Sequence, residues 1–238
     1  MLWQPTRPFE FSSSVIDKLK FKWLAVKPVS TLIFALPKLR KLLTARSINE
    51  RIVETPFILG RLPPIGAKIL DVGACESPVS LMLASLGYAV TAVDLRPYPF
   101  FHPNLRVVQG DITHMNLKAE YDAVICLSTL EHIGLPVYGG RKIAGGDRLA
   151  IRAMHKLLVP AGKLLLTTPA APVGQLLPAW RVYSPPALTK LLKLFKSVRI
   201  NYGIKSEPES WTVHSSLPAN RYLTSAVPTA VALIEAIK

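Results

Sequence analysis

Residues 69–78, ILDVGACESP, decide the fold class of this 238-residue chain. A short apolar run ends there at an aspartate and a glycine, and Ser77 and Pro78 then supply a helix N-cap and a first helical residue. Apolar residues recur behind Pro78 at helical spacing until Gly87 ends the helix. A buried strand followed directly by a helix is the repeating unit of a parallel sheet.

The same alternation continues toward the C-terminus. We expect helices at residues 147–158 and 185–195, and strands at residues 68–72, 88–93, 105–108, 121–127, 163–168, 198–204 and 211–215. This pattern predicts an α/β fold with a doubly wound, mostly parallel seven-stranded, Rossmann-like sheet. Around this domain, residues 67–215, we expect a basic, Pro-interrupted helical extension at residues 1–66 and an apolar helix at residues 216–238.

Composition excludes several classes of protein. The chain is half hydrophobic, which excludes intrinsic disorder, and its two cysteines exclude a disulfide-stapled scaffold. No Cys and His residues have the spacing of a zinc site, so we predict no metal. The longest apolar runs are shorter than the roughly 20 residues that a membrane span requires. We therefore expect a cytoplasmic protein, either free or peripheral at the membrane.

The net charge of +14, from 29 Lys and Arg against 15 Asp and Glu, is unevenly distributed. Residues 67–133 hold four basic and seven acidic residues, so the positive surplus belongs to the flanks. Basic and apolar residues alternate in the N-terminal 66 residues. Such segments either rest on an anionic membrane surface or cover the domain as helices with a solvated basic face, and we leave both interpretations open.

Polar residues follow the predicted strands at the points where the strands end. Asp71 comes at the end of the first strand, Asp94 after the second, Asp111 after the third and Ser128 after the fourth. In an open α/β sheet, ligands bind outside the carboxyl ends of the strands, where the strand order reverses. A single Asp at such a place is often only a turn former, but three at successive strand ends predict a binding crevice.

The ordered segments of this domain resemble the motifs of class I S-adenosylmethionine-dependent methyltransferases over residues 66–205. The segments are ILDVGACESP, VTAVDLRPYP, VVQGDI, YDAVICLSTLEHIG and HKLLVPAGKLLLTTP. The resemblance implies S-adenosylmethionine as cofactor, with its ribose on Asp94 and its adenine on Asp111 and the backbone of Ile112. The cofactor-binding residues that it implies are Asp71, Gly73, Ala74, Cys75, Asp94, Leu95, Asp111, Ile112, Leu127 and Ser128.

The first loop departs from the family pattern. Family members usually have glycine at every second position there, whereas this chain has Cys75 and Ser77. We expect the Cβ of Cys75 to narrow the pocket at the methionine end. The departure counts more strongly against a nicotinamide-dependent reductase, because a pyrophosphate needs a close backbone approach at the second glycine.

The residues that would bind the methyl acceptor are less clearly indicated by the sequence. Glu131 and His132 match an acidic-histidine pair that often follows the fourth strand in the family, and His132 is either a general base or a residue that caps a helix or lines the pocket. The Gly-rich loop at residues 134–146 is either a lid that orders on an acidic substrate or a surface insertion. The expected substrate-binding residues are Glu131, Tyr138, Arg141, Arg181 and Tyr183.

We therefore expect a methyltransferase that moves the methyl group to an oxygen or nitrogen of an acidic or membrane-presented small molecule, such as a phosphorylated or lipid-linked sugar. A nucleic-acid acceptor is disfavoured, since no N-P-P-Y-like or Pro-Cys string is present. The principal alternative is a binding or scaffold module that has lost the cofactor. The other is the reductase, which also lacks a Tyr-x-x-x-Lys helix.

Overall fold

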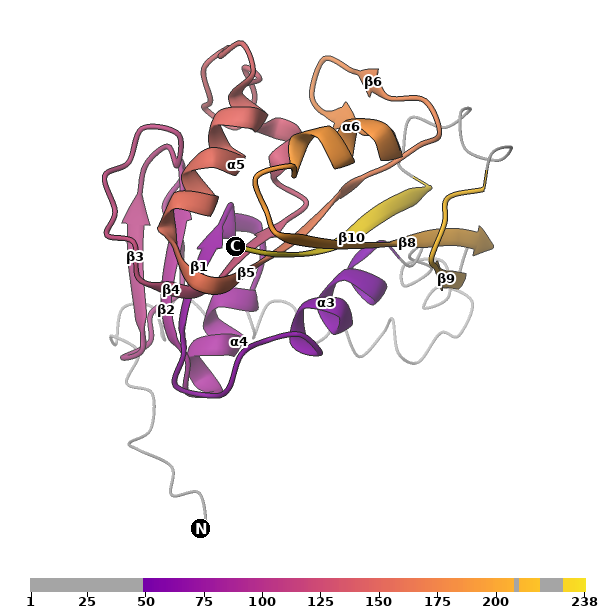
Figure 1. Ribbon diagram of the computed structural model, residues 1–238. Coiled ribbons are helices and arrows are strands. Elements are labelled where there is room, and N and C mark those ends of the chain that lie inside the picture. Colours follow the sequence, from indigo (N-terminus) through magenta and orange to yellow (C-terminus); the bar gives the residue numbers. More distant parts are fainter. Residues whose placement is uncertain (1–48, 208–209, 219–228) are drawn as a thin grey trace, which may run out of the picture. The chain divides into compact units, whose positions relative to one another are not determined.

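The computed structural model describes residues 49–207, 210–218 and 229–238, so the expected N-terminal extension lies largely outside the described residues (Figure 1). An eight-stranded sheet has the order β3-β2-β1-β4-β5-β10-β8-β9. The elements are α3 (Arg51–Leu59), β1 (Lys68–Val72), η1 (Ala74–Glu76), α4 (Val79–Ser85), β2 (Ala89–Asp94), β3 (Leu105–Gln109), β4 (Tyr121–Leu127), η2 (Leu130–His132), α5 (Gly146–Leu157), β5 (Leu158–Pro169), β6 (Gln175–Leu176), β7 (Arg181–Val182), α6 (Pro185–Leu191), β8 (Ser197–Glu207), β9 (Ser210–His214) and β10 (Ala230–Ile237).

The first five strands of the sheet pair in parallel, and β10, β8 and β9 complete it in antiparallel pairs. Strand order reverses at β1, which has β2 on one side and β4 on the other. The loops after these strands leave from the same edge of the sheet, where ligands bind in folds of this type.

Helices cover both faces of the sheet, as a doubly wound fold requires. On one face, α5 and α6 bury Met154 and Leu188 in a cluster that includes Leu70 and Leu166 of the sheet. On the other face, α3 and α4 pack on strand residues of a second cluster. The alternating strand residues divide between the two clusters, which is the burial pattern of a central parallel sheet.

Residues 230–237 form a strand, whereas a helix was expected over residues 216–238. Strand β10 lies between β5 and β8, antiparallel to both, which makes the sheet eight-stranded and extends the domain beyond residue 215. The run AVALIEAI is apolar almost throughout, and such a short run has no periodicity that separates a buried strand from a buried helix. Its one charge, Glu235, lies 3.3 Å from Lys163 Nζ and 3.7 Å from Arg61 Nε.

Helix α3 lies within the expected N-terminal extension but is part of the domain. The helix contributes Phe57 and Ile58 to the second core cluster. Pro56 lies within the helix. The boundary expected at residue 67 is therefore too late, because the sheet face needs this helix to bury it. Among the residues that the structure describes, no helix is long and apolar enough to cross a membrane.

The position of β10 predicts a measurable loss of stability. Ile234 is fully buried in β10, so we expect Ile234→Ala to lower the free energy of unfolding by about 2–5 kcal/mol through lost burial and a residual cavity. Ile65, which is 70% exposed, offers a matched control. Ile65→Ala should change the free energy of unfolding by less than about 0.5 kcal/mol. Urea unfolding of both variants measures the difference. Equal, small effects would contradict a central β10.

Candidate functional site

A pocket of about 840 Å³, its solvent-open part included, lies at the carboxyl edge of β1, β2 and β4. The loops after these strands and the Gly-rich loop before α5 form its wall. The lining residues are Arg51, Val72, Gly73, Ser77, Val93, Asp94, Leu95, Arg96, Gly110, Asp111, Ile112, Leu127, Ser128, Thr129, His132, Ile133, Gly134, Leu135, Val137, Tyr138, Gly140 and Arg141.

The loop after β1 passes the loop after β4 at Gly73. The Gly73 N–H donates to the Val93 carbonyl at 2.8 Å, and its φ of +83° is in the left-handed region that favours glycine. A Cβ at this position would overlap the side chain of Thr129. Glycine is therefore required here by the contact between two loops of the protein, as well as by any ligand beside it.

Cys75 does not narrow the pocket, contrary to expectation. Its N–H donates to Asp94 Oδ2 at 3.0 Å, and its Sγ lies 3.5 Å from the Pro97 carbonyl oxygen, on the side of the loop after β2. Neither Cys75 nor the fully buried Ala74 is among the lining residues. Ser77, the other departure from the glycine pattern, does line the pocket, and its Oγ accepts the Val79 N–H at 3.2 Å where α4 begins.

Asp94 ends β2 and faces the pocket. Besides the Cys75 N–H, it accepts the Arg96 N–H at 2.9 Å, and Arg96 Nε lies 3.3 Å from the same oxygen, Oδ1. These donors fix the carboxylate, and Oδ2, which accepts the Cys75 N–H, has a second lone pair for a ligand hydroxyl. Leu95 lines the pocket beside it.

Asp111 follows β3 at the far side of the pocket. Its Oδ1 accepts the Thr113 N–H at 2.9 Å and the Thr113 hydroxyl at 2.7 Å, as in an Asx turn, and Oδ2 lies 3.5 Å from His114 Nδ1. The buried Ile112 adds an apolar wall. Asp111 is thus both a turn former and a pocket residue.

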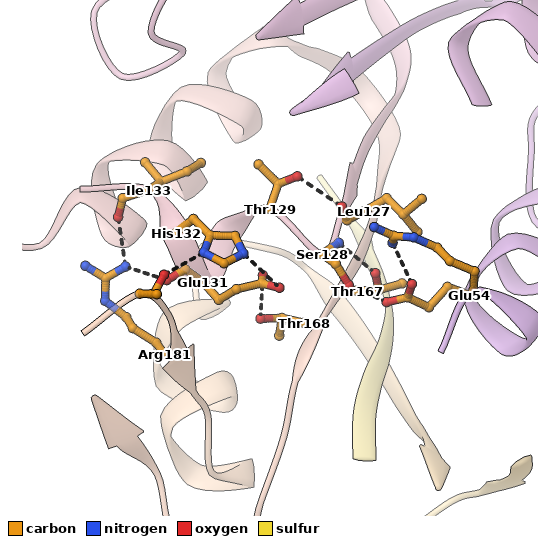
Figure 2. Close-up of polar contacts among 12 residues, drawn as sticks. Glu54, Leu127, Ser128, Thr129, Glu131, His132, Ile133, Thr167, Thr168 and Arg181 are labelled. Atoms are coloured by element: carbon orange, nitrogen blue, oxygen red, sulfur yellow. Dashed lines mark hydrogen bonds and ion pairs between the residues drawn. The ribbon is translucent and has the colours of Figure 1, made fainter. Parts of the chain in front are cut away.

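The loop after β4 is tied to α3 by a buried carboxylate (Figure 2). Ser128 Oγ donates to Glu54 Oε1 at 2.6 Å, and Arg51 Nη1 donates to Glu54 Oε2 at 2.7 Å. Glu54 is fully buried, whereas Arg51 lines the pocket. Ser128 has a φ of +42°, an unusual conformation for a residue with a Cβ, and Thr167 accepts its N–H.

Sequence reasoning missed Arg51, Glu54 and Thr129. Arg51 and Glu54 lie in the chain well before the recognisable motifs, and only their spacing of three residues on a helix relates them to each other. Nothing local in the sequence indicates that they reach Ser128.

Two of the expected ligand residues, Asp71 and Glu131, are buried behind the pocket and do not line it. The Ser80 hydroxyl donates to Asp71 at 2.7 Å, and burial raises the pKa of Asp71 to about 6. The Thr168 hydroxyl donates to Glu131 at 3.1 Å, and burial raises the pKa of Glu131 to about 8. Both carboxyl groups support the loops that form the pocket.

His132 lines the pocket and connects its wall to the hairpin of β6 and β7. Its Nδ1 lies 2.7 Å from the Ala179 carbonyl oxygen, which makes Nδ1 the protonated nitrogen, and its Nε2 lies 4.0 Å from Glu131 Oε1 (Figure 2). The neutral ring therefore has its basic nitrogen at Nε2.

The Gly-rich loop at residues 134–146 forms one side of the pocket. The Tyr138 ring makes an edge contact with His132 at 5.0 Å between centroids, and the Arg96 guanidinium lies 4.7 Å from the Tyr138 centroid. Arg141 lies further along the lining. Tyr138 thus connects the loop after β2 with the loop after β4.

Arg181 and Tyr183, expected to bind substrate, do not line the pocket. Arg181 Nη1 donates to the Ile133 carbonyl at 2.8 Å and to the Glu131 carbonyl at 3.2 Å (Figure 2). The Tyr183 hydroxyl donates to Asp147 Oδ2 at 3.2 Å, and burial raises the pKa of Tyr183. In this structure, both residues fix the segment after β5 to the pocket wall.

No group of three or more His, Cys, Asp or Glu side chains is arranged for a metal ion among the described residues. The polar groups of the lining are carboxylates, guanidinium groups, hydroxyls and one imidazole. Two carboxylates and a guanidinium at separate places suit a ligand that carries hydroxyls, a positive charge and a carboxylate.

Comparisons with known proteins agree with this fold. Residues 70–166 match the family model described as a methyltransferase domain. The chain is 34% identical over 127 residues to the ubiquinone biosynthesis O-methyltransferase of Xanthomonas axonopodis pv. citri, which is 49% of this chain and 48% of that protein. The corresponding protein of Xanthomonas oryzae pv. oryzae is 33% identical over the same coverage. The chain thus spans about half the length of the curated relatives that it matches.

Solved structures show the same fold at low sequence identity. The 1,6-didemethyltoxoflavin-N1-methyltransferase of Burkholderia thailandensis, with S-adenosylhomocysteine bound, is 16% identical with a TM-score of 0.53, over 98% of this chain and 93% of that one. A possible histamine N-methyltransferase of Thermotoga maritima is 13% identical with a TM-score of 0.54, over 91% and 99%. Residues 70–166 therefore match a methyltransferase domain, and the chain has the fold of these solved methyltransferase structures.

Proposed function

We propose that the protein is an S-adenosylmethionine-dependent methyltransferase that acts on an oxygen or nitrogen of a small-molecule acceptor. The observation that carries this proposal is that Asp94 and Asp111, which follow successive parallel strands, line one pocket with Gly73 at the point where strand order reverses. The similarity to the Xanthomonas proteins, which are named O-methyltransferases, supports an oxygen acceptor.

The pocket residues divide among the parts of the cofactor. Asp111 and Ile112, after β3, would hold the adenine, and Asp94 and Leu95, after β2, the ribose hydroxyls. The methionine part would then lie along the ends of β1 and β4, by Gly73, Leu127 and Ser128. When bound, the cofactor supplies a methyl group on a positively charged sulfur, which is already an activated leaving group.

Arg51 is the cation at the methionine end. It pairs with Glu54, which in turn holds Ser128 at the end of β4, and its charge also acts on Asp71 at the end of β1. A guanidinium has five donors, so Arg51 can bind Glu54 and still donate to a ligand carboxylate. We infer that it binds the carboxylate of the methionine part.

The acceptor would lie against His132, Tyr138 and Arg141. Methyl transfer requires mainly that the acceptor atom lie in line with the methyl carbon and that water be excluded. His132, with Nε2 basic, would take the proton of a hydroxyl or amine acceptor. Arg141 has no ion pair among the described residues, and an acidic group on the acceptor would supply one.

A binding or scaffold module is the alternative function, because a fold of this type does not by itself establish catalysis. Calorimetry of the full chain with S-adenosylhomocysteine separates the two. Binding in the micromolar range supports the methyltransferase, and no heat of binding at millimolar ligand favours the scaffold.

The ribose assignment predicts the effect of Asp94→Asn. One charged hydrogen bond contributes about 1.5–3 kcal/mol, and Asn keeps one acceptor oxygen but loses the charge, so this variant should bind S-adenosylhomocysteine about 10- to 100-fold more weakly. Asp122 is a matched control. It lies at the start of β4, at the opposite end of the strand from the pocket, and accepts the Lys68 N–H at 2.8 Å. Asp122→Asn should retain the affinity of the unaltered chain within about twofold. Equal affinities of the two variants would contradict the assignment.

The carboxylate assignment predicts a ligand-dependent effect of Arg51→Gln. Removing the guanidinium should weaken S-adenosylhomocysteine binding about 10- to 100-fold, since a charge-assisted hydrogen bond is lost. Methylthioadenosine lacks the amino-acid part, so its affinity should stay nearly constant in the same calorimetric titration. A parallel loss for both ligands would show that Arg51 acts on the loop structure and not on the carboxylate.

A further inference from the structure

Residues 148–206 contain ten Lys and Arg and no Asp or Glu. They form most of α5, then β5, the hairpin of β6 and β7, α6 and most of β8. Figure 1 shows α5, α6 and β6 on the same side of the sheet, and the buried residues of α5 and α6 belong to one core cluster. Every charged side chain that this stretch presents to solvent there is positive.

Contacts within this face bring four of its cations together. The rings of His155 and Phe195 meet edge to face at 5.0 Å, so the last turn of α5 lies beside the turn that follows α6. The solvent-exposed residues of these two segments include Arg152, Lys156, Lys193 and Lys196, which we name the basic patch.

Among the described residues, no acidic side chain pairs with the basic patch. Its four residues make no ion pair within the part of the chain that the structure describes. Asp147, in the first turn of α5, is occupied by the Tyr183 hydroxyl and by Arg181 Nε at 3.9 Å. Burial and then the Lys238 ammonium lower the pKa of His155, which agrees with a positive potential at this face.

Exposed aliphatic side chains accompany the basic patch. Leu149 and Leu194 are 38% and 44% exposed on α5 and after α6. The adjoining segment 170–180 carries no charge, and Val173 and Leu176 there are 61% and 71% exposed. This segment meets the start of α6, since a Cβ on Gly174 would lie 3.4 Å from Ser184 N.

The residue types on this face indicate which kind of polyanion it would bind, a lipid bilayer or a nucleic acid. Aliphatic residues among lysines and arginines are typical of surfaces that lie in the headgroup region of a bilayer. Single-stranded nucleic acids are instead bound by exposed aromatic side chains between the cations, whereas Phe195 at the basic patch is 7% exposed and Trp180 of the hairpin is half-buried. The face therefore fits lipid better than nucleic acid.

We propose that the outer face of α5 and α6, with the β6–β7 hairpin, docks on an anionic lipid bilayer. The basic patch would bind the headgroups, and Val173, Leu176 and Leu194 would enter the interfacial region. The loop that lines the pocket leads directly into α5, so docking would hold the pocket near the lipid. The docking does not rest on the proposed methyltransferase function.

Cosedimentation of the full chain with vesicles tests the proposal. We expect binding to phosphatidylcholine vesicles that contain about one quarter phosphatidylglycerol, none to phosphatidylcholine alone, and release as salt rises. Because each cation near the surface contributes about fivefold, Arg152→Gln/Lys156→Gln should lower the partition coefficient about 25-fold. The control Arg106→Gln/Lys118→Gln removes two exposed cations elsewhere and should change it less than about threefold.

A second pair of variants tests the aliphatic part at constant charge. Leu176→Ser should weaken binding to the anionic vesicles about tenfold, since it removes a side chain that would be withdrawn from water. Leu86, the residue that caps the C-terminal end of α4, is 52% exposed, and Leu86→Ser should leave binding unchanged.

The proposal fails if the basic-patch variant binds anionic vesicles as strongly as the unaltered chain, because the binding would then belong to another segment. It also fails if the unaltered chain binds single-stranded RNA but no vesicle. Calorimetry with S-adenosylhomocysteine on every variant separates the two hypotheses. Unchanged ligand affinity beside lost vesicle binding supports the docking face, whereas absent ligand binding in the unaltered chain contradicts only the methyltransferase proposal.

Discussion

The pocket depends on one close approach, between the backbone of Gly73 after β1 and the side chain of Thr129 after β4. Since β1 and β4 are adjacent and parallel, with Asp71 opposite Ile125, their loops leave the sheet side by side and no room remains for a Cβ at residue 73. On its other side, the first loop is held to β2 by the bond from the Cys75 N–H to Asp94. The loop is thus fixed between both neighbouring strands, and its conformation sets the floor of the pocket.

Behind that floor, the fold buries three carboxyl groups with one guanidinium close by. Glu54 is paired directly with Arg51, whereas burial raises the pKa of Asp71 to about 6 and that of Glu131 to about 8. The folded-state pKa of Glu131 exceeds its ordinary 4.5, so folding takes up a proton between these values. Its contribution to stability is complete below about pH 4.5 and is lost as the pH rises to about 8. At neutral pH, Glu131 is therefore mostly protonated and Asp71 mostly ionised behind the pocket, and Asp94 and Asp111 are the carboxyl groups that face a ligand.

The sequence predicted the parts of this architecture that repeat a local pattern. Short apolar strands, helices and polar residues at strand ends lie within a few positions of each other, so the amino-acid pattern alone places the parallel core, Asp94 and Asp111. It does not place the strand β10, because an apolar run of eight residues suits a buried helix or a buried strand, and only its position between β5 and β8 decides. Arg51 and Glu54 were missed for a related reason, since their role depends on a contact with Ser128, 74 residues beyond Glu54. Arg181 shows the opposite case, in which a polar residue expected at the substrate forms hydrogen bonds to backbone carbonyls.

The uneven charge of the chain reconciles a cationic ligand with a protein of net charge +14. At physiological ionic strength, charges are screened over about 8 Å, so a ligand at the pocket responds to the groups beside it and not to the distant surplus. Asp94 and Asp111 line the pocket together with Arg51, Arg96 and Arg141, and Arg51 and Arg96 are paired with Glu54 and Asp94. The exposed cations of the basic patch lie on α5 and in the turn after α6 and are absent from the lining. A cationic ligand therefore meets a pocket in which carboxylates and guanidinium groups balance each other, whereas an extended anionic surface, which spans many screening lengths, would respond to the basic face as a whole. The same distribution of charge would permit ligand binding at the pocket and contact with an anionic surface, because the first depends on groups within about 8 Å and the second on the whole basic face.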